Sequence, residues 1–212
     1  MTSTHTIAML GAGNVGAALA RNLIGLGERV RFGVPDPQKH RALAETLGAD
    51  IGSVADALDA ADIAILAVPY AAALDIAAAV PDWNQRILID ATNPLNPGLA
   101  GLALGPSTSA AEQLAARARN ARVVKCFNTT GAENMADPRR LDGGVFMPLA
   151  SDDAEARAVV SALVARMGFD AADAGALSAA RYLEPFAMTW IHFAFAAGAG
   201  RDWAFSRVRR SR

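Results

Sequence analysis

The chain has 212 residues, 52% hydrophobic and 19% charged, so it can bury the apolar core of one domain and is too apolar to stay disordered. Its 20 basic and 21 acidic side chains nearly cancel, which excludes a strongly basic nucleic-acid or membrane-surface binder and favours a small-molecule partner. The single Cys126 excludes an intramolecular disulfide, and no Cys/His cluster has zinc-site spacing, so we predict a cytoplasmic protein without a metal centre. No basic flank precedes an apolar run at the start, so no signal peptide is expected.

Short apolar runs alternate with alanine-rich amphipathic stretches, the pattern of β-α-β units around a parallel sheet. The predicted strands lie at residues 6–10, 29–34, 62–68, 86–91, 122–127 and 144–150, with a weaker one at 168–174. The predicted helices follow the first strand up to Gly27 and lie at 38–47, 53–60, 70–79, 109–119, 152–167 and 179–197. This alternation predicts an α/β fold with a doubly wound, mainly parallel sheet of Rossmann type. We expect that domain to occupy residues 1–175, followed by a small helical segment at 176–212.

The motif Gly11-x-Gly13-x-x-Gly16 follows the first predicted strand and opens the first predicted helix. In this setting Gly11 allows the tight turn, Gly13 removes a side chain that would block a pyrophosphate, and Gly16 lets helix and strand pack closely. The free N–H groups and the positive end of the helix dipole would then face the pyrophosphate. The motif therefore predicts dinucleotide binding.

The residues after the second predicted strand bear on the choice between NAD and NADP. A carboxylate there would bind the ribose 2′-hydroxyl of NAD, and a basic residue would bind the 2′-phosphate of NADP. Lys39 and Arg41 could reach a phosphate, whereas Asp36 would repel it. Pro35 and Pro37 could equally shape a turn into the next helix. The pattern favours NADP and leaves NAD open.

Six motifs resemble those of the NADPH-dependent reductases of the deazaflavin coenzyme F420. The fold of this family also forms the cytosolic oxidoreductase domain of the six-transmembrane epithelial antigen of prostate metalloreductases. The motifs are IAMLGAGNVGAALARNL, ADIAILAVPYAAA, LIDATNPL, SAAEQLA, VVKCFNTTGAENM and DAGALSAARYLEP, and they span residues 7 to about 190. The first is common to Rossmann enzymes, whereas the last two, in this order, are much more specific.

The resemblance implies that the dinucleotide lies along the carboxyl edge of the sheet. The pyrophosphate would contact the glycine loop and the helix start. The nicotinamide ribose would contact the turn after the strand predicted at 62–68, and the nicotinamide would contact the ends of the strands predicted at 86–91 and 122–127. The residues so implied are Gly11, Ala12, Gly13, Asn14, Val15, Gly16, Val34, Pro35, Lys39, Val68, Pro69, Tyr70, Asn93, Pro94, Asn128 and Ala132. The chain departs from the family at Val34 and Pro35, where members that bind NADP typically carry Ser-Arg or Arg-Asp.

The activity implied by the resemblance is hydride transfer between NADP(H) and coenzyme F420, FMN or FAD. Both redox partners hold the electronic capacity for this step, so the protein needs no nucleophile. It has to stack two rings within about 3.5 Å of each other and exclude water. The sequence identifies no defined catalytic residue. Asn128 is the first candidate, because its amide can both donate and accept hydrogen bonds.

Other reactive side chains have structural interpretations. His192 lies among aromatic residues and is predicted to be a core or interface histidine. Cys126, in a strand pattern, is predicted to be a small buried hydrophobe. Arg181 and Glu184 lie three residues apart on a predicted helix, so we expect them to pair with each other, with a place near the catalytic site left open by the family motif.

The apolar stretch at residues 186–200 is shorter than the ~20 residues that cross a bilayer. We predict that it packs over the sheet edge and forms much of a homodimer contact. The arginines that follow are expected to form a solvated, frayed tail; they are Arg201, Arg207, Arg209, Arg210 and Arg212.

Alternative functions remain open at this point. A non-catalytic dinucleotide sensor would use the same glycine loop, and a soluble ferric reductase would use the same flavin site. A hydroxyacid or imine reductase begins similarly, but its helical substrate domain does not fit in the 37 residues after Gly175, and residues 152–200 lack the lysine expected of it.

Overall fold

A computed structural model of the chain describes residues 5–59, 61–208 and 210. Its main sheet has six parallel strands in the order β3-β2-β1-β4-β5-β6, and β7 and β8 form a separate parallel pair. The strands are β1 (Thr6–Leu10), β2 (Arg29–Gly33), β3 (Asp50–Gly52), β4 (Ile63–Leu66), β5 (Ile87–Asp90), β6 (Arg122–Lys125), β7 (Phe146–Leu149) and β8 (Asp170–Asp173). This strand order confirms the predicted doubly wound α/β fold.

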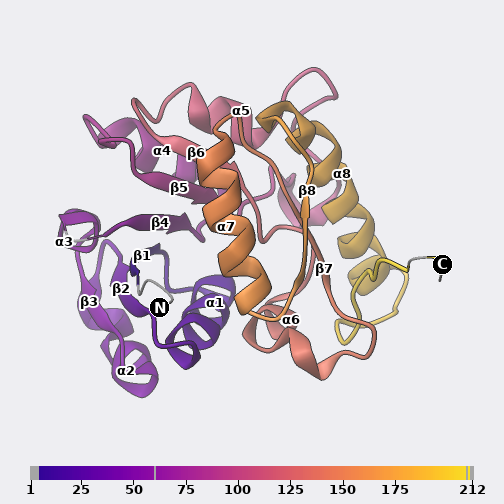
Figure 1. Cartoon of the computed structure of the whole chain (residues 1–212), viewed down its shortest axis with the longest axis horizontal. Coiled ribbons are helices and arrows are strands. Elements are labelled where there is room, and N and C mark those ends of the chain that lie inside the picture. The colour runs from indigo at the N-terminus through magenta and orange to yellow at the C-terminus, as the bar shows by residue number, and fades with distance from the viewer. Residues whose placement is uncertain (1–4, 60, 209, 211–212) are drawn as a thin grey trace.

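Helices connect the strands and cover both faces of the main sheet. They are α1 (Asn14–Gly25), α2 (Pro37–Leu47), α3 (Val54–Asp59), α4 (Tyr70–Ala79), α5 (Ala110–Ala115), α6 (Ala132–Ala136), α7 (Ala154–Arg166) and α8 (Ala180–Ile191). A π-helical turn at His192–Ala196 continues α8. Figure 1 shows α7 crossing in front of the sheet near α1 and α6, with α8 at the opposite end of the molecule from β2 and β3. Among the residues described, no helix combines the length and apolar character that a membrane crossing requires.

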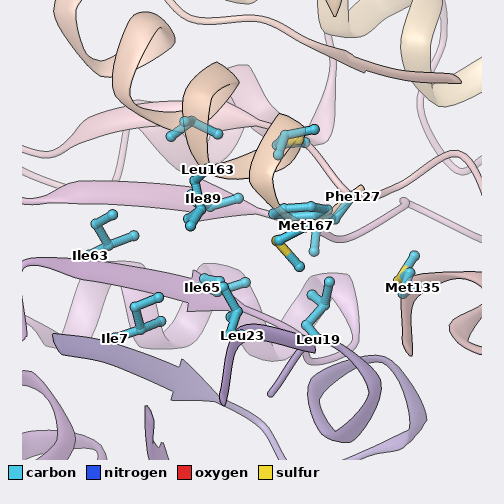
Figure 2. Packing of buried hydrophobic residues seen from close by; sticks show 14 of the residues in the cluster. Ile7, Leu19, Leu23, Ile63, Ile65, Ile89, Phe127, Met135, Leu163 and Met167 are labelled. Carbon is cyan, nitrogen blue, oxygen red and sulfur yellow. The ribbon is translucent and has the colours of Figure 1, made fainter. Parts of the chain in front are cut away.

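Two apolar layers form the core, because successive strand residues point to opposite faces of the sheet. Along β1, Ile7 and Met9 belong to the layer that α1, α6 and α7 cover, whereas Ala8 and Leu10 belong to the layer that α3, α4 and α5 cover. Figure 2 shows the first of these layers, in which Leu19, Leu23, Leu163 and Met167 surround Ile7, Ile63, Ile65 and Ile89. Burial on both faces explains why the strands read as nearly continuous apolar runs.

The strand register aligns the carboxyl ends of five strands at one edge. Leu10 at the end of β1 lies opposite Gly33 of β2 and Leu66 of β4. Leu66 in turn lies opposite Asp90 of β5, and Asp90 lies opposite Lys125 of β6. The loops that follow these strands therefore share one rim, and β1 and β4 flank the point where the strand order reverses.

Several predicted element bounds differ from the structure. The three-residue strand β3 and the five-residue helix α6 escaped prediction, because neither is long enough to show a hydrophobic period. The predicted strand 122–127 ends at Lys125, since Phe127 has a φ of +57°. The predicted helix 179–197 divides into a 3-10 turn, α8 and the π-helical turn.

The predicted frayed tail is wrong as far as Arg207. The Phe146 N–H donates to the Phe205 carbonyl at 2.9 Å, so the tail lies against the first residue of β7. Arg207 forms an ion pair with Asp170 at 2.6 Å. The tail is ordered there because Phe205 packs on Phe186 of α8, with ring centroids 4.3 Å apart. Arg201 also pairs, with an acidic residue of α6, whereas Arg210 is exposed; Arg209 and Arg212 lie outside the described residues.

Candidate functional site

The three glycines of the loop differ in the space around them: a side chain would clash at Gly11 and Gly16 but not at Gly13. Gly11 has a φ of +114°, and a Cβ added to it would lie 2.5 Å from the Ala67 carbonyl oxygen. A Cβ on Gly16 would lie 2.1 Å from the Gly11 carbonyl oxygen, so a side chain there would force α1 away from the end of β1, whereas a side chain on Gly11 would press on the turn after β4. A Cβ on Gly13, by contrast, would meet no protein atom within 4 Å. The fold therefore requires Gly11 and Gly16, whereas Gly13 leaves space that an anion can fill.

The amino terminus of α1 opens onto that space. Gly13 is the N-cap residue, no side chain caps the helix, and its first turn contains no acidic residue. The first N–H groups of a helix have no partner within it, and Asn14 and Val15 carry two of them. Together with the helix dipole, these groups suit a phosphate.

Asp36, the carboxylate expected to repel a 2′-phosphate, forms hydrogen bonds with the first turn of α2. Asp36 caps α2, and its Oδ1 accepts hydrogen bonds from the backbone N–H groups of Gln38 at 3.1 Å and Lys39 at 3.3 Å. The Lys39 side chain is exposed on the first turn of α2. Val34 is buried and Pro35 exposed, and neither offers a polar side chain. Lys39 is the first cation that follows β2 in the sequence.

The turn after β4 lies against the glycine loop. A Cβ on Gly11 would come within 2.7 Å of Val68 Cγ1, so these two loops touch. Pro69 is the N-cap of α4 and Tyr70 its first residue. The Tyr70 hydroxyl donates to Gln113 Oε1 at 2.7 Å, and burial raises the pKa of Tyr70 above its usual value. Tyr70 therefore stays neutral and ties α4 to α5 at this edge.

Asn93 and Asn128 join the ends of β5 and β6. Asn93 Nδ2 donates to the Asn128 carbonyl at 2.9 Å, and Asn128 Nδ2 donates to Asn93 Oδ1 at 3.1 Å and to the Leu183 carbonyl at 3.2 Å. Asn128 is 4% exposed, yet its Oδ1 has no hydrogen-bond partner within the described part of the chain. Buried polar atoms normally have such a partner. The orphaned oxygen suits a ligand that brings a donor, such as a carboxamide.

Two further implied residues frame this pair. Pro94 follows Asn93 and is buried, and Ala132 is the buried first residue of α6. Gly131, which precedes Ala132, lies against α8, because a Cβ there would come within 2.7 Å of the Trp190 ring. All the implied loops therefore lie on the carboxyl edge, and α8 bounds it next to β6.

A buried ionic cluster lies below this edge and was not predicted from the sequence. Lys125 Nζ is fully buried and lies 2.6 Å from the Thr92 carbonyl oxygen, 2.9 Å from Asp90 Oδ2 and 3.1 Å from Glu184 Oε1. The remaining oxygen of Asp90 accepts from the Thr92 N–H at 2.9 Å. Glu184 also accepts from Ala110 N at 3.0 Å and from its neighbour along α5. We call Lys125, Asp90, Glu184 and the Thr92 carbonyl the lysine cluster.

The two carboxylates keep the lysine charged. Burial alone would lower the pKa of Lys125, but the charges of Asp90 and Glu184 outweigh burial, so its pKa lies above the usual value. Alternation along β5 and β6 gave no hint of this cluster. Its only sequence signal was a charged residue within each of two otherwise apolar runs.

Two predictions about α8 are wrong. Arg181 does not pair with Glu184 but with Glu112, at 2.6 Å, because Glu184 points inward to Lys125. The hydrogen bond from Arg181 lowers the pKa of Glu112. His192 is exposed, so its interpretation as a core residue fails and only an interface role stays open. Cys126 is buried as predicted, and burial raises the pKa of its thiol.

Helix α5 begins with a capping box of altered form. Ser109 Oγ accepts from the Glu112 N–H at 3.2 Å, and its hydroxyl donates to the Glu112 carboxylate at 2.8 Å.

Over residues 5–59, 61–208 and 210, no three or more His, Cys, Asp or Glu side chains come together in a way that could hold a metal ion.

A protein-family model and several solved structures match this chain. The family model for NADP oxidoreductases that depend on coenzyme F420 matches residues 6–94. A solved structure described as an F420-dependent NADP reductase from Arthrobacter sp. FB24 is 28% identical, with a TM-score of 0.82, and the match covers 97% of this chain and all of that one. A hypothetical protein from Sinorhizobium meliloti is 30% identical, with a TM-score of 0.76, over 83% of this chain and 87% of that one.

A curated relative extends beyond this chain. The metalloreductase STEAP3 of Rattus norvegicus is 30% identical over 179 residues, which make up 84% of this chain. Those residues are 35% of the rat protein, so this chain spans about a third of that relative's length.

Proposed function

The chain belongs to the F420-dependent NADP oxidoreductase family, related to the oxidoreductase domain of STEAP3, and on that premise we propose that it transfers a hydride between NADP(H) and a deazaflavin or flavin acceptor. The observation that carries this proposal is the open space at Gly13 beside the uncapped amino terminus of α1. The orphaned Asn128 Oδ1 supports the same placement at the far end of the edge.

In this proposal the chain binds and orients rather than reacts. The N–H groups of Asn14 and Val15 hold the pyrophosphate, and Val68 and Pro69 border the nicotinamide ribose. Asn128 Oδ1 accepts a hydrogen bond from the nicotinamide carboxamide, which fixes the face of the ring. When bound, the reduced nicotinamide supplies the hydride and the acceptor ring takes it up, so no protein nucleophile is required.

An anaerobic mixing experiment tests the activity. The protein is mixed with NADPH and, in separate reactions, coenzyme F420, FMN and FAD, and nicotinamide absorbance is followed. We expect NADPH oxidation in step with reduction of at least one of these acceptors. NADPH binding without turnover by any acceptor would instead indicate a dinucleotide sensor.

A second candidate function is flavin-dependent ferric reduction, which the identity with STEAP3 favours. It requires the same flavin reduction followed by electron transfer to iron. A ferric chelate added with catalytic flavin therefore separates the two functions. Ferrous product formed faster than free reduced flavin can account for would assign the metalloreductase activity.

We propose NADP rather than NAD as the preferred nucleotide, with Lys39 as its discriminating residue. Because Asp36 Oδ1 accepts from backbone N–H groups of α2 rather than from the Lys39 ammonium, that ammonium can bind a 2′-phosphate. Lys39→Glu is expected to weaken NADPH binding about tenfold and to leave NADH binding unchanged, because only NADPH carries the phosphate. Titration of both nucleotides checks this, and an equal change for both would refute the assignment.

We further propose that the apolar stretch at residues 186–200, within the C-terminal segment 176–212, forms much of a homodimer contact. Trp190 is 4% exposed because it stacks on Trp203, whereas Phe193 and Phe195 are 47% and 51% exposed. Phe193→Asp with Phe195→Asp is expected to convert a dimer to a monomer in sedimentation velocity. Val208→Asp, at an exposed apolar residue of the tail, is the control and should stay dimeric. A monomeric wild type would contradict the proposal.

The compartment proposed for this activity is the reducing cytoplasm, where the single, buried Cys126 stays a free thiol.

A further inference from the structure

The lysine cluster has no part in the hydride transfer proposed above. Two of its members, Thr92 and Glu184, are nevertheless next in sequence to residues that accept hydrogen bonds from Asn128. Thr92, whose carbonyl accepts from Lys125, directly precedes Asn93. Glu184, which pairs with Lys125, directly follows Leu183. Asn93 Oδ1 and the Leu183 carbonyl are the two acceptors of the Asn128 amide, at 3.1 and 3.2 Å. The cluster is therefore one residue away from both.

Stability alone gives little reason to bury these charges. The desolvation of buried ions commonly offsets their attraction, and apolar side chains of similar volume are often at least as stable. What the cluster adds is fixed geometry, because the three N–H bonds of the Lys125 ammonium have three acceptors within 3.1 Å. This arrangement sets β5, β6 and α8 relative to one another at the rim.

We propose that Lys125 and Glu184 are positioning residues for the nicotinamide half of the dinucleotide. Through the Thr92 carbonyl and Leu183 they hold Asn93 and Asn128 so that Asn128 Oδ1 faces the ligand. Occupancy of the nicotinamide position is thereby linked to α8, which supplies both Glu184 and the Leu183 carbonyl. This inference rests on the proposed function, since it requires that a nicotinamide nucleotide binds at this edge.

Glu184→Gln tests the positioning role. Both carboxylate oxygens of Glu184 accept hydrogen bonds, so the N–H2 group of a glutamine would meet at least one donor from Lys125, Ala110 or Ala111. We expect the Kd for NADPH to rise about tenfold by isothermal titration calorimetry. The Kd for adenosine 2′,5′-bisphosphate, which lacks the nicotinamide half, should change less than about twofold.

Glu28→Gln is the matched control. Glu28 is also a buried carboxylate in an ion pair, with Arg166 at 2.7 Å, but it precedes β2 and so lies at the opposite edge of the sheet. The same chemical change there should leave both dissociation constants unaltered. Should Glu184→Gln not fold, Asp90→Asn takes its place, because its amide would oppose either Lys125 Nζ or the Thr92 N–H.

Hydrogen exchange on the wild-type protein tests the link between the nicotinamide position and α8 without any substitution. NADPH should protect the backbone amides of residues 183–191 more than the bisphosphate does. Equal protection by the two ligands, or equal losses of their affinities in a folded variant, would overturn the positioning role. A wild type that binds the bisphosphate but shows no added protection with NADPH counts against this inference alone, whereas one that binds neither ligand refutes the proposed function itself.

Discussion

Replacing Gly13 by valine is expected to weaken NADPH binding about a hundredfold, or about 3 kcal/mol, and to leave the protein folded. Gly13 has a φ of −80° and a ψ of −171°, which valine adopts without strain. A Cβ at this position points into open space, so the valine side chain would extend into the space at the α1 amino terminus. Loss of the N-cap glycine should cost no more than about 1 kcal/mol of unfolding free energy.

Gly25→Val is the matched control for this result. Gly25 ends the same helix, and a Cβ there also meets no protein atom within 4 Å. Valine has a higher helix propensity than glycine, so stability should not fall. NADPH affinity should equal that of the wild type. If the Gly13 variant bound NADPH as tightly as this control, the pyrophosphate would not lie at the glycine loop.

The second large effect is expected at Lys125, where methionine should lower the free energy of unfolding by about 3–5 kcal/mol. The substitution keeps the length of the side chain but leaves Asp90 and Glu184 buried without their cation. Urea denaturation followed by circular dichroism measures the loss. Lys39→Met is the natural control, because Lys39 is the chain's other lysine and is exposed, so the same change there should stay within about 0.5 kcal/mol of wild type.

The stability contributed by the Lys125 charge has a defined pH dependence. The pKa of Lys125 is raised in the folded protein, so the contribution is fully present below the unfolded value of about 10.4. It is lost as the pH rises through the folded-state pKa. The wild type should therefore lose no stability from this charge across neutral pH and should lose it in strong alkali, which urea denaturation over that range measures. Wild-type stability that stays unchanged as the pH rises above about 10.4 would contradict this origin.

Local patterns predicted the fold because the strands of a doubly wound sheet are buried on both faces. The runs at Thr6–Leu10 and Ile87–Asp90 are apolar along nearly their whole length, and each is followed by a loop on the same edge. Gly16 also acted as predicted, since the atom that a side chain there would meet first is the carbonyl oxygen of Gly11 in the same loop. Features that depend on neighbours in sequence or on strict periodicity could therefore be predicted from the sequence.

Contacts between segments that lie far apart in the sequence could not be predicted from local patterns. Glu184 was expected to pair with Arg181 on its own helix, but its partner Lys125 lies in a strand 59 residues earlier. No periodicity encodes such a pairing, because it depends on how α8 packs against the sheet. The order of the tail at Phe205 and Arg207 has the same cause, namely contacts with α8 and β8.

A crystal structure of the protein with NADPH tests the central claim most directly. We expect density for the pyrophosphate over Gly13 at the start of α1, with the nicotinamide carboxamide donating to Asn128 Oδ1. A nucleotide bound elsewhere, or one whose nicotinamide lies away from Asn93 and Asn128, would contradict the account.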